Sequence, residues 1–231
     1  MSFPAPHIIP ARAEHKYTLI LLHGRNSDGE SFSEELFEGR TSSNKPMIEQ
    51  LSTNCKWIFP SARESYSTVF QEELQEWFDI YSLTNPNAEW ERQVDGLKES
   101  VEYIRSIVEE EMKYLPPQSI ILGGISQGFA TASHVLFRLP TSLGGFVGLS
   151  GWIPSMALSI PQSTLSTGTP VYVSHSEDDA VVELSHGVAA SDRLRHLGYK
   201  TCFQVFGDGG HWIQEPQGFD GLNDFLERCL Q

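Results

Sequence analysis

The stretch from Ser119 to Leu136 constrains the fold of this chain most strongly. It begins with an aliphatic run at 120–122, typical of a short buried strand. After Gly128 its apolar side chains recur every three or four residues, as in a helix. Between the two lies Gly-Ile-Ser-Gln-Gly at 124–128, which places Ser126 on a strand-to-helix turn whose glycines let neighbouring backbone pass closely. We therefore interpret Ser126 as a nucleophile rather than as part of a purely structural turn.

Short apolar runs alternate along the chain with amphipathic segments, as expected for a mostly parallel sheet with helices on both faces. The predicted strands are 17–22, 56–59, 120–122, 145–149, 171–174 and 201–206. The predicted helices are 31–37, 46–51, 91–114, 128–139, 184–197 and 218–230.

The sequence contains no internal repeat, low-complexity tract or linker, so we predict a single α/β domain over 1–231 with an N-terminal arm at 1–16. Three prolines favour an extended arm or an edge strand for the first ten residues. The segments 61–90 and 151–170 are expected to be irregular and to shape the pocket. Neither segment has the pattern of a long amphipathic lid helix, so no large lid is expected.

The charge and cysteine pattern narrows the class of protein. A net charge of −14 without a basic cluster disfavours nucleic acid and anionic membrane surfaces as partners. The three cysteines, Cys55, Cys202 and Cys229, lack metal-ligand spacing and are expected to be reduced thiols of a cytoplasmic protein. No signal peptide and no apolar run of membrane-spanning length are recognisable. Nothing in the sequence indicates an oligomeric state.

A serine nucleophile needs a general base and an acid that orients it. In a common arrangement on a parallel sheet, the acid and then the histidine follow the serine in chain order, each in a loop after a strand. Among the eight histidines, His211 alone lies in a loop after the last predicted strand, and it is the predicted base. For the acid, Glu177, Asp178 and Asp179 all follow the strand at 171–174, and the spacing leaves the choice among them open.

The same chemistry needs two hydrogen-bond donors for the oxyanion. The turn itself places the backbone amide of Gln127, and the loop after the strand at 17–22 offers the amide of Arg25. Gly24 allows that loop to approach closely, and His23 is interpreted as a brace of the loop rather than as a catalyst.

The candidate site residues belong to longer motifs that occur from about Leu19 to Leu226. These segments are Leu-Leu-His-Gly at 21–24, Pro60 with Ala62, Trp-Phe-Asp-Ile at 77–80, Leu-Gly-Gly-Ile-Ser-Gln-Gly at 122–128, Leu-Ser-Gly-Trp-Ile-Pro at 149–154, His175 with Asp179 and Val182, and Gly-His at 210–211. In these segments the chain resembles the acyl-protein thioesterase/phospholipase-carboxylesterase group of α/β-hydrolases. The combination of Ser-Gln in the turn with Trp-Phe-Asp at 77–79 is quite specific to this group.

The resemblance implies an α/β-hydrolase fold and a catalytic triad of Ser126, Asp179 and His211, with the amides of Arg25 and Gln127 as oxyanion donors. It also implies a serine hydrolase that cleaves carboxylic esters or thioesters with an apolar acyl group, without a metal or organic cofactor. The substrate would be a small molecule or a lipidated protein. The alternatives are a carboxylesterase of small soluble esters with no protein substrate, and a non-catalytic ligand-binding member of the fold.

Three residues depart from the pattern of the family. Arg-Asn-Ser at 25–27 stands where Leu-Gly-Asp is usual, Ser176 follows His175 where Gly is usual, and the bulky Trp212 follows His211 where a small residue is common. Since a backbone amide does not depend on its side chain, catalysis is expected to tolerate Arg25, whereas the shape of the acyl pocket is expected to differ. The residues expected around the substrate pocket are Trp77, Trp152 and Trp212.

Overall fold

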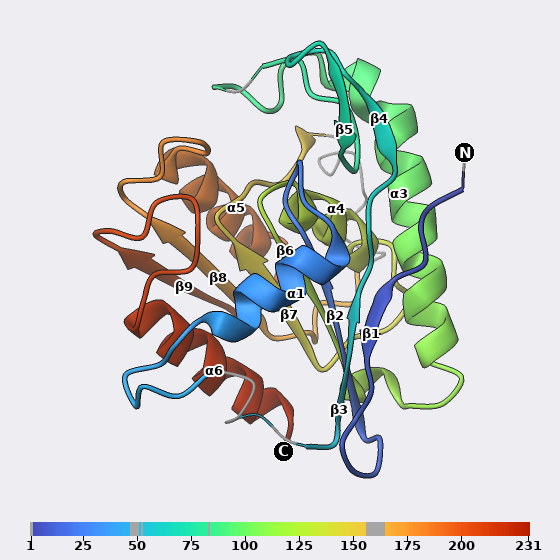
Figure 1. Cartoon of the computed structure of the whole chain (residues 1–231), viewed down its shortest axis with the longest axis vertical. Helices are drawn as coiled ribbons and strands as arrows, with labels where there is room; N and C mark the ends of the chain where they lie inside the picture. The colour runs from blue at the N-terminus through green and yellow to red at the C-terminus, as the bar shows by residue number, and fades with distance from the viewer. Residues whose placement is uncertain (1, 47–50, 52, 83, 156–164) are drawn as a thin grey trace.

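The computed structural model describes residues 2–46, 51, 53–82, 84–155 and 165–231 (Figure 1). Its centre is a seven-stranded sheet with the order β1-β3-β2-β6-β7-β8-β9, counted within that part of the chain. Strand β1 is antiparallel to β3, and the remaining neighbours are parallel. The strands are β1 (His7–Ile9), β2 (Tyr17–Leu22), β3 (Cys55–Phe59), β6 (Ile120–Ile125), β7 (Gly145–Leu149), β8 (Val171–Ser176) and β9 (Thr201–Phe206).

Helices cover both faces of this sheet (Figure 1). One face carries α1 (Gly29–Glu38) and α6 (Gln217–Cys229), whose apolar side chains pack on alternate residues of the central strands. The other face carries α3 (Trp90–Glu111), α4 (Gln127–Leu136) and α5 (Leu184–His196). The predicted mostly parallel sheet with helices on both faces is confirmed.

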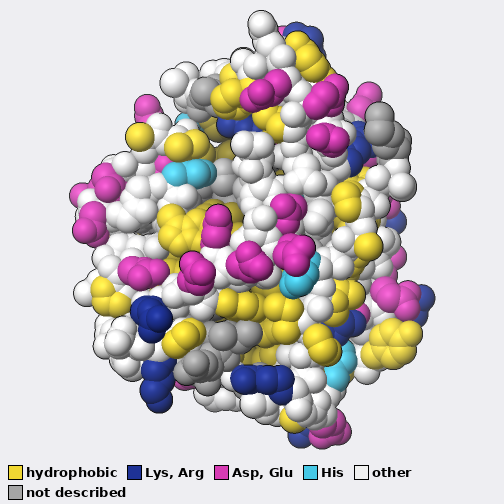
Figure 2. Space-filling view, viewed as in Figure 1, with side chains coloured by type: hydrophobic (Ala, Val, Ile, Leu, Met, Phe, Trp, Pro, Cys, Tyr) yellow, Lys and Arg dark blue, Asp and Glu magenta, His cyan; other side chains and the backbone are white. Residues whose placement is uncertain are grey.

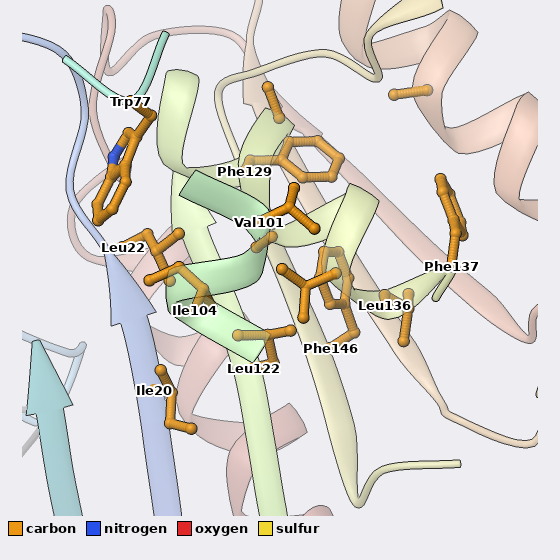
Figure 3. Close-up of a cluster of buried hydrophobic side chains, with 14 of the residues drawn as sticks. Ile20, Leu22, Trp77, Val101, Ile104, Leu122, Phe129, Leu136, Phe137 and Phe146 are labelled. Atoms are coloured by element: carbon orange, nitrogen blue, oxygen red, sulfur yellow. The ribbon is translucent and has the colours of Figure 1, made fainter. Parts of the chain in front are cut away.

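The larger core cluster lies between the sheet and helices α3 and α4 (Figure 3). Every residue of α4 is buried, because this helix is enclosed by the sheet and by α3. At its centre the fully buried Phe129 ring lies 5.9 Å from that of Phe146 on β7. A helix without a solvent face fixes the position of the turn that precedes it, and Ser126 is the residue of that turn.

The surface is acidic on the face shown in Figure 2, where carboxylate side chains gather over α1. That helix carries Glu30, Glu34, Glu35 and Glu38 and has no basic residue in its last turn. None of the helices in the described part of the chain is long and apolar enough to cross a bilayer.

One expectation about the segment 61–90 is wrong. It contains an antiparallel hairpin of β4 (Glu64–Ser67) and β5 (Glu72–Gln75) instead of being wholly irregular. The two strands are short and mostly polar, so they lack the apolar alternation by which strands are recognised. The turn between them is made by Gln71 with a φ of 56°, a conformation that its residue type does not signal.

Some of the remaining expectations are confirmed, and others concern residues that the structure does not describe. Within the first ten residues His7–Ile9 form the edge strand β1, and the helix expected at 31–37 is α1. The helix expected at 46–51 lies largely outside the described residues, as does 156–164 of the expected loop at 151–170. No large lid covers the carboxyl ends of the strands in the part of the chain that is described.

We predict that Phe129→Ala destabilises the fold by about 3–5 kcal/mol, because it leaves a cavity under a helix that cannot shift toward solvent. Chemical denaturation followed by circular dichroism measures this. The matched control is Tyr114→Ala at a side chain that is 71% exposed, which should change the free energy of unfolding by less than about 0.5 kcal/mol. Equal effects of the two substitutions would contradict the assignment of Phe129 to the core.

Candidate active site

Ser126 sits at the carboxyl end of β6 in a strained conformation, with φ 57° and ψ −121°. Its amide donates to the Leu149 carbonyl at 2.8 Å, and its own carbonyl accepts from Ala130 at 3.1 Å in the first turn of α4. The turn depends on the flanking glycine at 128, where a Cβ would lie 2.3 Å from the Leu22 carbonyl oxygen. Tertiary packing therefore holds a non-glycine residue at a positive φ, the arrangement expected of a nucleophile turn.

Asp179 and His211 form a close pair at the carboxyl ends of β8 and β9. The His211 Nδ1 lies 2.8 Å from Oδ2 of Asp179, whose side chain is fully buried while that of His211 is 23% exposed. The other carboxylate oxygen accepts the amides of Val181 and Val182 at 2.9 Å. Burial alone would raise the pKa of Asp179, but the hydrogen bonds from His175, His211 and Val182 hold it well below its ordinary value. Asp179 is therefore ionised at neutral pH.

The structure separates the three acids that the spacing left open. Asp179 is buried, whereas Glu177 and Asp178 are exposed. Asp178 accepts the amide of Gly210 at 2.8 Å and so holds the glycine loop that carries His211. Asp178 thus braces this loop through its backbone, and Asp179 contacts the imidazole itself.

His23 lies beneath the expected oxyanion loop and is 0% exposed. The Ala62 amide donates to its Nε2 at 2.9 Å, so Nδ1 carries the hydrogen and donates to the Gly24 carbonyl at 2.5 Å. Burial lowers the pKa of His23 to about 4, although the Gly24 bond and Asp28 favour the charged form. A neutral ring that is bonded at both nitrogens is the geometry of a brace.

The Gln127 side chain explains why Ser-Gln and Trp-Phe-Asp occur together in the sequence. Its Oε1 accepts the Trp77 amide at 2.9 Å, and its Nε2 donates to the Phe78 carbonyl at 2.5 Å. The indole of Trp77 in turn donates to the His23 carbonyl at 2.9 Å. These bonds join the residue after Ser126 to both loops that surround the site.

Arg25 points its side chain toward the β4–β5 hairpin, with the guanidinium carbon 4.5 Å from the centroid of the Phe70 ring. Burial lowers the pKa of Arg25, while Glu76 and Asp79 act in the opposite direction. Glu76 is 1% exposed, and its burial together with Asp79 raises its pKa to about 7. The next residue in the loop, Asn26, donates its amide to Gln75 at 2.8 Å, so the hairpin holds the loop in place.

A small cavity of about 20 Å³, enough for roughly one water, lies against Ser126. Of the three tryptophans expected around the pocket, Trp152 lines this cavity. Trp77 instead lies behind the site and supports His23, and Trp212 packs edge-on against Phe32 at 6.0 Å. The lining residues among those described are Arg25, Ile80, Pro86, Ser126, Gln127, Trp152, Val181 and Val182.

No cluster of three or more His, Cys, Asp or Glu side chains suited to a metal ion occurs among the described residues. The groups that the structure does gather at this edge of the sheet are a strained serine, a histidine bonded to a buried carboxylate, and a neutral brace under a loop. Nucleophilic acyl transfer uses groups of these kinds.

A family model described as phospholipase/carboxylesterase matches residues 4–230. The chain belongs to this family. As a member it is a hydrolase with the α/β-hydrolase fold, and the relatives named below are described as thioesterases.

Curated relatives match over nearly the whole chain. Acyl-protein thioesterase 1 of Yarrowia lipolytica is 33% identical over 228 residues, which cover 96% of this chain and 95% of that protein. Acyl-protein thioesterase 1 of Candida albicans is 31% identical over 241 residues, which cover 100% of both chains. Among solved structures, acyl-protein thioesterase 2 of Zea mays superposes with a TM-score of 0.77 at 25% identity, covering 99% of this chain and 100% of that one.

We predict that Glu76→Gln stabilises the protein at pH 8 and has a much smaller effect at pH 5. The raised pKa means that the native state holds this proton up to about pH 7, whereas the unfolded chain loses it near 4.5. Stability of the wild type therefore falls as the pH rises through this window, and the amide removes that loss. Thermal unfolding at pH 5, 6, 7 and 8 measures the difference. Glu73→Gln, at an exposed position of the same hairpin, is the control and should give a flat difference.

Proposed function

We propose that this chain is a serine hydrolase that cleaves carboxylic esters or thioesters with an apolar acyl group through an acyl-enzyme intermediate. The pair of His211 with the buried, ionised Asp179 is the observation that supports this most directly. A buried carboxylate bonded to Nδ1 leaves Nε2 of the imidazole free to act as a base. Ser126, at the carboxyl end of the same parallel sheet, is the proposed nucleophile.

In the proposed reaction His211 Nε2 takes the hydroxyl proton as Ser126 Oγ attacks the carbonyl carbon of the substrate. The backbone amides of Arg25 and Gln127 donate to the oxyanion of the tetrahedral intermediate. The intermediate collapses, and the imidazolium returns the proton to the departing alcohol or thiol. A water then attacks the acyl-enzyme by the same route and releases the carboxylic acid and the free serine. Asp179 holds the imidazole in the required tautomer throughout.

The curated relatives are named acyl-protein thioesterases, and they support a lipidated protein as the substrate. The small cavity beside Ser126 favours a second candidate, a carboxylesterase of small soluble esters, because it has little room for a long acyl chain. Rates on matched thioesters and oxyesters with acyl groups of two to sixteen carbons, measured as kcat/KM, distinguish the two candidates. A maximum at long acyl thioesters supports the first, and a maximum at acetyl or butyryl oxyesters supports the second.

We further propose that the protein acts in the cytoplasm. Cys202 and Cys229 form no disulfide in the structure, as suits a reducing compartment.

Ser126→Ala should lower kcat by several orders of magnitude, to the rate left by binding and the oxyanion donors alone. A fluorophosphonate probe should label the wild type at this residue and should not label the variant. The matched control is Ser119→Ala at the opposite end of β6, which should keep both labelling and rate. If Ser126→Ala keeps more than about a tenth of the wild-type rate, or if the wild type is not labelled, the proposed function fails.

Asp179→Asn should reduce kcat by a factor on the order of 10⁴, since the amide favours the wrong imidazole tautomer. Asp178→Asn removes the same charge one residue away, where the carboxylate holds the Gly210 backbone, and should change kcat by only a few-fold. Both variants are assayed on one substrate, with circular dichroism to check the fold. A larger loss in Asp178→Asn than in Asp179→Asn, or equal modest losses in both, would contradict the assignment of Asp179 as the acid.

A further inference from the structure

His175 is a buried histidine that the triad does not include. It lies near the carboxyl end of β8 with a side chain that is 0% exposed. Sequence order excludes it as the base, because it precedes the acid. Its surroundings are nevertheless those of the site, since it contacts Asp179 and the loop that follows Asp179.

The two ring nitrogens of His175 have different environments. Nε2 lies 2.7 Å from the Val182 carbonyl oxygen, which can only accept, so Nε2 carries a hydrogen and donates it. The same nitrogen lies 3.3 Å from Oδ2 of Asp179. Nδ1 is buried and has no hydrogen-bond partner. All the polar contacts of the ring are therefore made by the nitrogen that faces Asp179.

Helix α5 holds the ring in this orientation by steric contact. Gly187 of that helix lies against the imidazole, and a Cβ at this position would be 2.4 Å from His175 Nδ1. The orphan nitrogen thus faces a glycine backbone with no room for a water or a side chain. Burial of an unpartnered polar nitrogen is unfavourable, so the arrangement needs a compensating contact on the other side of the ring.

That compensating contact involves the carboxylate oxygen that also bonds His211. Oδ2 of Asp179 lies 2.8 Å from His211 Nδ1 and 3.3 Å from His175 Nε2, while Oδ1 is bound by two backbone amides. Building on the triad proposed above, we propose that His175 is a positioning residue that holds the Asp179 carboxylate toward His211 and shares its charge.

This sharing has a consequence for the plot of kcat against pH. We call the rising part of that plot at low pH the acid limb. An N–H beside Oδ2 draws charge from the oxygen and weakens its attraction for the His211 imidazolium. Without that N–H, the protonated imidazole is favoured, and the rise of activity with pH moves to higher pH. A residue that only braced the loop at Val182 would lower kcat without moving this limb.

The other charged and titratable groups around the pair remain in place in the variants considered below. Asp178 is bonded to the Gly210 amide beside His211, and Asp208 of the same loop contacts Gln214. On α5, His186 and Arg193 line a different cavity. None of these four side chains takes part in the contact between His175 and Asp179.

The test compares His175→Met, which fills the space without a donor, with His175→Gln, whose amide restores an N–H. Each is assayed for kcat and KM on 4-nitrophenyl acetate from pH 5 to 9, with thermal unfolding as a check of the fold. We expect the Met variant to lose about tenfold in kcat with little change in KM, and its acid limb to lie at higher pH. The Gln variant should return within a few-fold of the wild-type rate, with the limb restored.

A second variant leaves His175 itself intact. Gly187→Ala should displace the imidazole and reproduce the shift of the acid limb. The control on the same helix is Val188→Ala at a side chain that is 39% exposed, which should leave the profile unchanged. If His175→Met does not have the native circular dichroism spectrum, the comparison of Gly187→Ala with Val188→Ala decides whether His175 is a positioning residue.

Equal losses in the Met and Gln variants, or a loss of rate with an unmoved acid limb, would overturn the positioning role. The proposed function is tested separately by Ser126→Ala. If that variant is inactive while His175→Met and Gly187→Ala keep the wild-type profile, only the inference about His175 fails. If Ser126→Ala retains activity, the proposed function fails first.

Discussion

The close approach of α4 to β2 is the contact on which the site depends. A Cβ at Gly128 would meet two backbone carbonyls at the carboxyl end of β2, that of its last residue Leu22 at 2.3 Å and that of the following His23 at 2.5 Å. Only glycine permits the helix to start this near the sheet. Because α4 is buried on all sides, its first residue cannot relax, and Ser126 is held at a positive φ. Gln127, the first residue of this helix, lines one small cavity together with Ser126 and Arg25.

The roles of the histidines and carboxylates around this contact depend on how deeply each is buried and what it bonds, and not on residue type alone. His23 is buried, neutral and bonded at both nitrogens, whereas the partly exposed His211 has a buried anion at Nδ1. Asp179 is buried and kept ionised by donors, whereas Glu76 is buried with few donors, and its pKa is raised to about 7. Residues of one chemical type thus serve as brace, proposed base or proposed acid according to their surroundings.

The sequence predicted those parts of the molecule in which local pattern and packing agree. The alternation of apolar runs with periodic helices predicted the sheet, and the glycine-flanked turn predicted that Ser126 lies at the carboxyl end of β6. The β4–β5 hairpin was missed because its strands are polar and it is held by long-range contacts such as the Asn26 amide on Gln75. Trp77 was expected in the pocket but lies behind it, since nothing local reveals that Gln127 binds its amide. His175 was set aside on chain order, which does not report that two histidines approach one carboxylate oxygen.

The environment of Arg25 also bears on how such a site changes during evolution. Glu76 is buried in the electrostatic field of this guanidinium, and the adjoining loop is bonded to the same hairpin. Losing the arginine alone would leave an acid buried without its counter-charge, whereas replacing the acid by an uncharged residue removes the cost of its ionisation. The arginine is therefore expected to be lost only after the acid has been replaced, so the two positions are expected to covary. Lineages with an aliphatic residue at position 25 should carry an uncharged one at 76, and the cavity beside Ser126, which Arg25 lines, would then change in both size and polarity.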